Sequence, residues 1–481
     1  MSDSSSPPPR GGAEHPPSHG HHENLNFKAP DISIPEIFDA AFAPIGVRGW
    51  RSDLVIGFCL LIIAFAAFMF SRQVFVGFWV TGLHLPVYWG GYIITFVFWI
   101  GVAHAGALIS ALLRLCGAEW KSAVTRVAEV ITLFTLPAAA SFPLIHVGRT
   151  ELAYYCLPLP NSRLLWPNFK SMLIWDVFAI STYLTGSVIF LYVTTVPDLG
   201  IARPRMKGWI KTVYTLLSWG WRGTAEEWKR VKEAAALYSV IILPVVISVH
   251  TIVSWDFAMQ VVPGWHSEVF GPIFFVGALF SGTAAVFTML TILIWVYPSF
   301  RLLITQVHYD MLGRVWLVLG LSWAYLFFND FIPAYYAHAS DKMDYYYYNG
   351  FGAYAPWWWG LIVVNFIIPL FCLAFQQFRR SIVPMFVLSI LVNIGMYLER
   401  VVIVIPGQEI YNKLNFNVLP YSVSYTELAI IAGTFAWVIG GLTAFCRIFP
   451  ILPYWELAET KSRQIEKDFA GTTVNFFHSG E

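Results

Sequence analysis

Charged residues are scarce in this chain. Asp, Glu, Lys and Arg make up 12% of its 481 residues, whereas a soluble globular domain carries about 25%. Hydrophobic residues reach 57% and aromatic residues 17%. This composition excludes an ordinary soluble domain and indicates an integral membrane protein. The formal net charge is only +1, and the lack of a strongly basic character excludes a nucleic-acid-binding protein.

Cysteine is also rare, and its spacing does not indicate a metal site. None of the cysteines forms a CxxC pair or stands in a Cys/His cluster with metal-ligand spacing. The sequence therefore predicts no metal site, no iron–sulfur cluster and no disulfide framework within this chain. The five cysteines are Cys59, Cys116, Cys156, Cys372 and Cys446.

The first part of the chain contains no apolar run that could serve as a signal-peptide core. It is rich in Ser, Pro, Gly and His, a composition typical of a solvated low-complexity tail. Its histidines (His15, His19, His21 and His22) are interpreted as part of that tail rather than as a metal site. We expect residues 1–50 to form a cytoplasmic tail and an interfacial segment, residues 51–450 a membrane domain, and residues 451–481 a cytoplasmic tail.

Long apolar runs dominate the rest of the sequence. A helix that crosses about 30 Å of hydrocarbon needs about 20 largely apolar residues. Ten such segments recur, so the predicted fold class is an all-α polytopic membrane protein. The expected spans are 53–70, 88–114, 125–147, 170–196, 231–254, 268–295, 309–332, 355–378, 380–404 and 424–449.

Lys and Arg predict the orientation, because cytoplasmic loops carry an excess of them. The connection after the fourth span holds eight basic residues between Arg203 and Lys232, whereas the connection after the fifth holds none. Both termini are therefore predicted to be cytoplasmic. Residues 209–230 interleave Trp with basic residues, which favours a helix that lies on the inner membrane surface.

Ionisable side chains gather near the predicted outer ends of several spans. Each costs at least about 2.5 kcal/mol in the membrane and is a functional candidate by default. In the string FPLIHVGR, His146 and Arg149 are three residues apart and would share a helical face at the end of the third span. The other candidates, predicted at the outer ends of the fourth, fifth and ninth spans, are Asp176, Asp256, His250, Glu399 and Arg400.

Each of these residues also has an ordinary structural explanation. A single His near a helix end is commonly an interfacial residue. Asp176 could cap its helix and favour the positive end of the helix dipole, and Glu399 with Arg400 could form a local charge pair. Their convergence on one side of the membrane nevertheless favours a functional site.

Quinol oxidation is a reaction that such a site would serve. Two protons leave the ring hydroxyls together with two electrons, so the pocket needs a base and a carboxylate that passes the proton on. His146 fits the first role and the Asp residues fit the second. An Arg nearby keeps the carboxylate ionised, and Pro143 with aromatic neighbours would shape an apolar slot open to lipid.

Deeper in the second and third spans, His104 and Glu129 are candidates for a proton path, with structural burial as the alternative.

Four short strings carry a resemblance to a known family. With ten spans, the strings FPLIHVGR, LIWDVF, SWDFAM and YLERVV together resemble the NrfD/PsrC-like quinol-interacting membrane subunits. The resemblance covers about residues 50–450 and is strongest to the ActC branch, which belongs to alternative complex III. None of the strings is specific for the family on its own. Their order along the chain and their predicted location on the same side of the membrane are specific.

The resemblance implies two four-helix bundles, spans 2–5 and 6–9, flanked by spans 1 and 10. It implies a periplasmic quinol site made by His146, Asp176, Asp256 and Arg400, with Arg149, Glu399 and His250 in support. Menaquinol or ubiquinol would be the substrate, and the chain would bind no redox cofactor itself. The implied partners are a periplasmic iron–sulfur subunit, a second NrfD-like membrane subunit and c-type cytochrome subunits with c-type haems. The implied location is the bacterial cytoplasmic membrane, and proton translocation has been proposed for such complexes.

Two other functions stay open at this point. A b-haem cytochrome would need two axial ligands, which His146 and His250 could supply from neighbouring odd-numbered spans. A secondary transporter would line a solute path with ionisable residues, but such sites usually lie near the bilayer midplane. The predicted gathering of charges at one face argues against the transporter.

Overall fold

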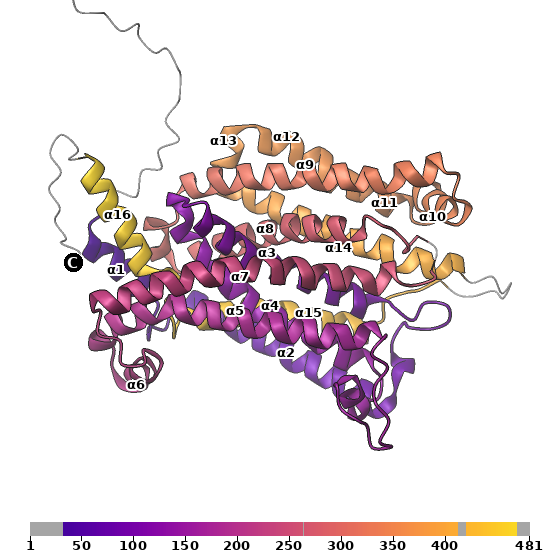
Figure 1. Ribbon diagram of the computed structural model, residues 1–481, viewed down its shortest axis with the longest axis horizontal. Helices are drawn as coiled ribbons and strands as arrows, with labels where there is room; N and C mark the ends of the chain where they lie inside the picture. Colours follow the sequence, from indigo (N-terminus) through magenta and orange to yellow (C-terminus); the bar gives the residue numbers. More distant parts are fainter. Residues whose placement is uncertain (1–31, 263, 412–419, 469–481) are drawn as a thin grey trace, which may run out of the picture.

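The computed structural model describes residues 32–262, 264–411 and 420–468, and these residues form helices without a β-strand. Ten helices are long and apolar enough to cross a membrane, which confirms the predicted all-α polytopic fold. They run side by side along the long axis of the molecule (Figure 1). Their bounds are α2 (Trp50–Val76), α3 (Gly91–Leu115), α4 (Thr125–His146), α5 (Met172–Ala202), α7 (Ala225–Ala258), α8 (Phe270–Val296), α9 (Gln306–Tyr336), α11 to α12 (Ala355–Ala374), α14 (Ile382–Tyr411) and α15 (Tyr425–Phe445).

The eighth span is not a continuous α-helix. It consists of α11 (Ala355–Ile362), a π-helical turn η6 (Val363–Ile367) and α12 (Ile368–Ala374). The shorter α-helices are α1 (Ile34–Phe42), α6 (Gly208–Leu217), α10 (Ser340–Phe351), α13 (Gln376–Arg379) and α16 (Tyr454–Asp468). Short 3-10 helices are η1 (Phe78–Val80), η2 (Glu119–Ala123), η3 (Thr150–Cys156), η4 (Arg203–Arg205) and η5 (Pro298–Leu302).

The short helices mark the two ends of the molecule. Helices α1, α6 and α16 lie at one end, and α10 lies at the other (Figure 1). The first of these ends carries the basic loops and is called the inner end here, since the Lys/Arg distribution predicts that it is cytoplasmic. The end with α10 is the outer end. At the inner end, Phe38 and Phe42 of α1 are buried and make ring contacts with Tyr454 of α16.

Helix α3 forms the centre of the structure. In the apolar 18-residue stretch of α3, 94% of the residues are buried, whereas 6% are buried in the equivalent stretch of α2. Close approach to its neighbours depends on glycine, because a Cβ on Gly106 would lie 2.2 Å from the carbonyl oxygen of Ala128 in α4. Small residues at such crossings are the usual way in which membrane helices gain packing contacts.

The contacts of α3 place the helices that carry the candidate residues beside one another. Helix α3 packs against α4 and α7, and α5 packs against the same two helices. In the second half of the chain, α8 packs against α9 and α14, while the eighth span packs against the same two. Helices α2 and α15 pack against each other, and α15 also contacts α4. The outer ends of α4, α5 and α7 are therefore neighbours.

Candidate functional site

Two carboxyl groups meet near the outer end of the molecule. Asp176 lies in the second turn of α5 and Asp256 in the last turn of α7, and both residues are buried. Their side chains lie close enough to interact with each other. One carboxyl must carry a proton to donate to the other, because two ionised carboxylates can only accept hydrogen bonds. Two buried carboxyl groups this close together are therefore candidates for holding and exchanging protons.

Each of these carboxyl groups also has an oxygen without a partner. Oδ1 of Asp176 and Oδ1 of Asp256 are buried and make no hydrogen bond within the described ranges. A buried polar atom without a partner is costly unless water or a ligand satisfies it. The two oxygens are therefore positioned to receive hydrogen bonds from a bound molecule. The sequence placed Asp256 beyond the end of its span, but α7 continues to Ala258 and keeps this carboxyl inside the helix.

His146 is the last residue of α4. Its ring meets the ring of Phe78 edge-on with 6.2 Å between the ring centroids, and its Nδ1 atom is buried without a partner among the described residues. The helix stops here because Gly148 adopts φ +80°, which is a left-handed conformation that favours glycine. A Cβ at this position would approach Phe78 to 2.9 Å. Gly148 thus lets Phe78 pack next to the imidazole.

The expectation that His146 and Arg149 share a helical face is wrong. Arg149 follows Gly148, lies outside the helix and is exposed to solvent. The i, i+3 spacing argument fails because the left-handed glycine changes the chain direction between the two residues.

Hydrogen bonds fix the turn that carries His146. The amide nitrogen Nε2 of Gln73, near the end of α2, donates to the carbonyl oxygen of Ile145 at 2.9 Å. The hydroxyl of Tyr92 in α3 donates to Oε1 of the same Gln73 at 2.5 Å. Three helix ends are thereby joined around the imidazole by buried polar contacts, which are strong in a low-dielectric surrounding.

A second cluster lies deeper in the membrane. The rings of His104 in α3 and His250 in α7 are 4.7 Å apart, and Tyr183 of α5 stacks on His104 at 4.6 Å. Nδ1 of His104 is 2.5 Å from the carbonyl oxygen of Ile100, so this nitrogen carries the proton and Nε2 is left as an acceptor. That Nε2 atom and both ring nitrogens of His250 have no partner in the described part of the chain.

Arg400 and Glu399 belong to this deeper level. The sequence placed them at the outer end of the ninth span, but α14 continues through Pro406 to Tyr411, so both lie about three turns inside the helix. They form a buried ion pair with each other, and Trp323 Nε1 donates to Glu399 Oε1 at 2.7 Å. A Cβ on Gly101 of α3 would be 3.5 Å from Arg400 Nη2, and the charge of Arg400 acts on His250. The structure thus brings Arg400 to the histidine pair.

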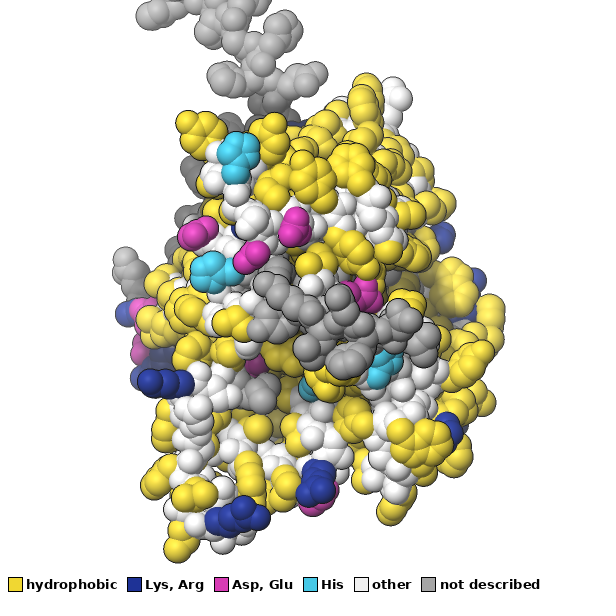
Figure 2. All heavy atoms as spheres, turned by 90° about the vertical axis from the view of Figure 1, so that its right-hand side faces the viewer, with side chains coloured by type: hydrophobic (Ala, Val, Ile, Leu, Met, Phe, Trp, Pro, Cys, Tyr) yellow, Lys and Arg dark blue, Asp and Glu magenta, His cyan; other side chains and the backbone are white. Residues whose placement is uncertain are grey.

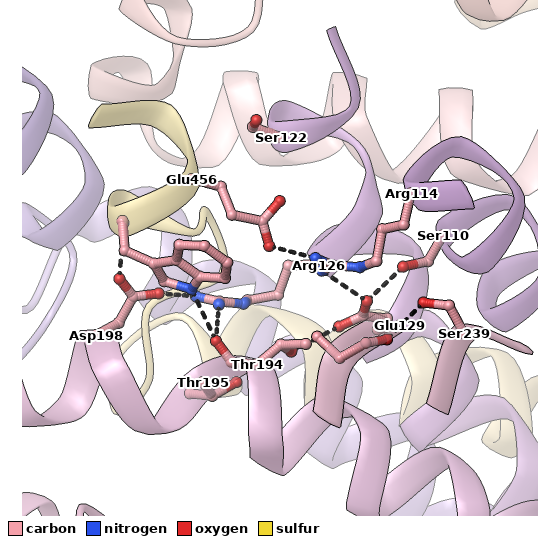
Figure 3. Close-up of polar contacts among 12 residues, drawn as sticks. Ser110, Arg114, Ser122, Arg126, Glu129, Thr194, Thr195, Asp198, Ser239 and Glu456 are labelled. Atoms are coloured by element: carbon pink, nitrogen blue, oxygen red, sulfur yellow. Dashed lines mark hydrogen bonds and ion pairs between the residues drawn. The ribbon is translucent and has the colours of Figure 1, made fainter. Parts of the chain in front are cut away.

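Glu129 is part of a separate polar network at the inner end (Figure 3). It accepts hydrogen bonds from Ser110 and, at 3.3 Å, from Thr194, and it forms an ion pair with Arg114 at 3.3 Å. Arg114 also pairs with Glu456 of α16 at 2.7 Å. The carboxylate is thus tied to a guanidinium and two hydroxyls. The sequence predicted how deep Glu129 lies in its span, but not which residues it contacts.

A second ion pair of the same network is completely buried. Arg126 of α4 pairs with Asp198 of α5, and Arg126 Nη2 donates to the carbonyl oxygen of Thr194 at 2.6 Å. The backbone N–H of Trp455 in α16 donates to Asp198 Oδ1 at 3.0 Å. These contacts join α4, α5 and the C-terminal helix.

An apolar cleft opens between α2, α4 and α15. Its volume is about 540 Å³, and its lining is almost entirely apolar. Ser141, Leu144 and Ile145 of α4 form part of the wall, so the cleft reaches the residue next to His146. Helices α2 and α15 lie at the periphery, which places the mouth of the cleft on the lipid-facing side.

Two comparisons with known proteins identify relatives of the chain. The family model described as "Polysulphide reductase, NrfD" matches residues 79–412, a range that includes every candidate site residue. A protein of Halobacterium salinarum described as a putative membrane subunit of a dimethyl sulfoxide reductase is 25% identical over 413 residues, which cover 84% of this chain and 86% of the relative.

Proposed function

Because this chain belongs to the NrfD polysulphide reductase family, we propose that it is the quinol-binding membrane subunit of a multi-subunit oxidoreductase. In this proposal the chain oxidises quinol at its outer end and passes the electrons to a partner protein. The description of the Halobacterium relative as a membrane subunit of a reductase supports a role within a complex. The described contacts do not bring together the two ligands of the b-haem alternative, because His250 lies beside His104 and His146 lies beside Phe78.

The observation that carries this proposal is the contact between Asp176 and Asp256. Quinol oxidation breaks two O–H bonds, releases two protons and two electrons, and leaves the quinone. The carboxyl pair holds one proton and accepts another, while its unpaired oxygens receive a hydrogen bond from the quinol hydroxyl. A buried carboxyl pair that exchanges protons in this way is typical of general acid–base chemistry.

His146 is proposed as the acceptor of the second hydroxyl proton. Its Nδ1 atom is buried and has no partner within the described ranges, and the hydrogen-bonded turn holds the imidazole in place. A neutral imidazole accepts a proton at a free ring nitrogen. The two electrons would leave one at a time to an iron–sulfur cluster of a partner protein, which would pass on the first before it takes the second.

Arg400 and Glu399 are assigned to a second level of the site, together with His104 and His250. This level lies between the carboxyl pair and the inner end, where Glu129 marks the next polar cluster. We propose that these residues stabilise negative charge on the quinol ring from the side that faces the inner end. They also offer a route along which protons move. Arg149 is proposed only as a supporting residue at the outer rim, because it is exposed.

The apolar cleft is proposed as the place of the isoprenoid tail. A quinol is dissolved in the bilayer, and its long tail must stay in apolar surroundings while the ring reaches the carboxyl groups. The cleft is open on the lipid side and ends beside the turn that carries His146.

The outer end is the proposed docking surface of the electron-accepting partner. Figure 2 shows this face, on which acidic side chains gather among hydrophobic ones. The exposed acidic residues here include Asp341 and Asp344 of α10 and Glu268.

In the narrower proposal, the complex is alternative complex III in a bacterial cytoplasmic membrane, with both termini of this chain cytoplasmic. It would contain an iron–sulfur subunit, a second NrfD-like subunit and c-type cytochromes, with menaquinol or ubiquinol as substrate and proton translocation as a further activity.

Turnover of the purified complex with quinol and an artificial electron acceptor tests the proposal. The double variant D176N/D256N removes both ionisable groups with little change in shape and should lower kcat by about 10²-fold or more. The variant D39N removes an exposed carboxylate at the inner end, away from the carboxyl pair and the docking surface, and should leave turnover unchanged. Equal turnover in all three proteins would refute the proposed site.

A further inference from the structure

A cluster of arginines near the inner end of the second half of the chain is not used by the proposed function. Asp310 of α9 has a side chain that is 1% exposed, and three guanidinium groups converge on it. Arg379 Nε is 2.8 Å from Oδ1, Arg314 Nη2 is 3.2 Å from Oδ2, and Arg380 Nε is 3.4 Å from Oδ2. Three positive charges against one negative charge leave this cluster at +2.

The three arginines are not equivalent. Arg379 is buried, and its Nη1 atom donates to the carbonyl oxygens of Leu373 and Ala374 at the end of α12, where it caps the helix. The side chains of Arg314 and Arg380 are 41% and 49% exposed, and both have donor atoms left after their contact with Asp310. Arg379 thus holds the cluster in the fold, while the other two present their guanidinium groups outward.

A shallow apolar groove, with a volume of only about 10 Å³, begins next to this pair. It is lined by Leu317 and Leu321 of α9 and by Phe366, Leu370 and Leu373 of the eighth span. Leu317 follows Arg314 by three residues, and the carbonyl oxygen of Leu373 is bonded to Arg379. The groove therefore continues from the arginine cluster towards the middle of the membrane. Phe371 and Phe375, also on this side of the chain, are 64% and 66% exposed.

We propose that Arg314 and Arg380 bind the phosphate group of an anionic phospholipid, with an acyl chain of that lipid lying against the exposed apolar surface of α9 over the groove. The excess positive charge complements a phosphodiester, and planar guanidinium groups bind phosphate oxygens in pairs. Basic pockets near the cytoplasmic ends of membrane helices attract anionic headgroups for the same reason. The occupant is a lipid rather than free phosphate, because the exposed side chains of Val318 and Leu321 add apolar contact next to the charge.

Native mass spectrometry of the purified complex tests this site with dioleoyl phosphatidylglycerol and dioleoyl phosphatidylcholine as probes. The wild type should bind phosphatidylglycerol about tenfold more tightly than phosphatidylcholine, and R314Q/R380Q should lose most of this preference. The control R222Q/R230Q removes two exposed arginines from the same end and should keep it. An unchanged preference in R314Q/R380Q, or an equal loss in both double variants, would overturn the proposal.

A second variant keeps the test valid if R314Q/R380Q does not assemble. L321W changes the shape of the apolar surface over the groove and leaves the arginines in place. It should weaken binding of dioleoyl phosphatidylglycerol but not of the short-chain dihexanoyl form. Millimolar inorganic phosphate should not compete with the long-chain lipid. Competition by phosphate alone would show an anion site without a lipid chain, and absence of binding in the assembled complex would show that a neighbouring protein covers this face; either result contradicts the proposal.

Discussion

Asp176 on α5 and Asp256 on α7 lie 80 residues apart in the sequence, yet their buried carboxyl groups contact each other at the outer end of the molecule. Helix α5 packs along α7, and each residue lies within about two turns of its helix end. The contact therefore follows from the antiparallel course of the two spans. In the proposed function, this pair holds one proton and accepts another.

The two carboxyl groups should act as a unit. D176N and D256N should each lower kcat for quinol oxidation by about 10²-fold, and the double variant should be little slower than either single one, because either change removes the shared proton. Steady-state turnover of the three complexes measures this coupling. Strictly multiplicative losses would show that the groups act independently.

His146 should affect turnover without affecting assembly. H146A removes the proposed base and should lower kcat by about 10²-fold, while the hydrogen bond from Gln73 to the carbonyl oxygen of Ile145 is retained because it involves the backbone. Turnover and the protein composition of the purified complex are the two measurements. A useful control is H266A, which changes an exposed histidine at the same end. Normal turnover in H146A would remove the base from the mechanism.

The apolar cleft should control access of long-tailed quinols. Ala67 of α2 is exposed and lines the cleft, whereas Ala64 on the same helix is exposed and lies outside the lining. A67W should raise KM for a long-tailed quinol roughly tenfold, equivalent to about 1.4 kcal/mol of lost binding, and should affect a short-tailed analogue less. A64W should behave like the wild type. If both variants change KM equally, the tail lies elsewhere.

The buried pair of Arg126 and Asp198 should dominate the stability of the inner end. R126M leaves the carboxylate of Asp198 buried without its counter-charge and should lower the free energy of unfolding by about 3–5 kcal/mol. R126M/D198N removes both charges and keeps an acceptor for the backbone N–H of Trp455, so it should recover part of that loss. Denaturant unfolding in detergent compares the two variants. A double variant less stable than R126M would contradict this account.

The number of spans could be predicted from the sequence because apolar length alone sets it. Partners across helices could not be predicted, and the pairing of Asp176 with Asp256 or of His104 with His250 depends on which helices become neighbours. Local backbone changes caused two of the errors of placement. Gly148 ends α4 between His146 and Arg149, and α14 tolerates Pro406 and continues outward, which leaves Arg400 deep in the membrane.

A cryo-electron microscopy map of the assembled complex with a bound quinol analogue tests the central claim most directly. The account predicts density for the ring within hydrogen-bonding distance of the Asp176–Asp256 pair and His146, with the tail leaving between α2, α4 and α15. Density for the ring in the second half of the chain, or at the inner end beside Glu129, would contradict it.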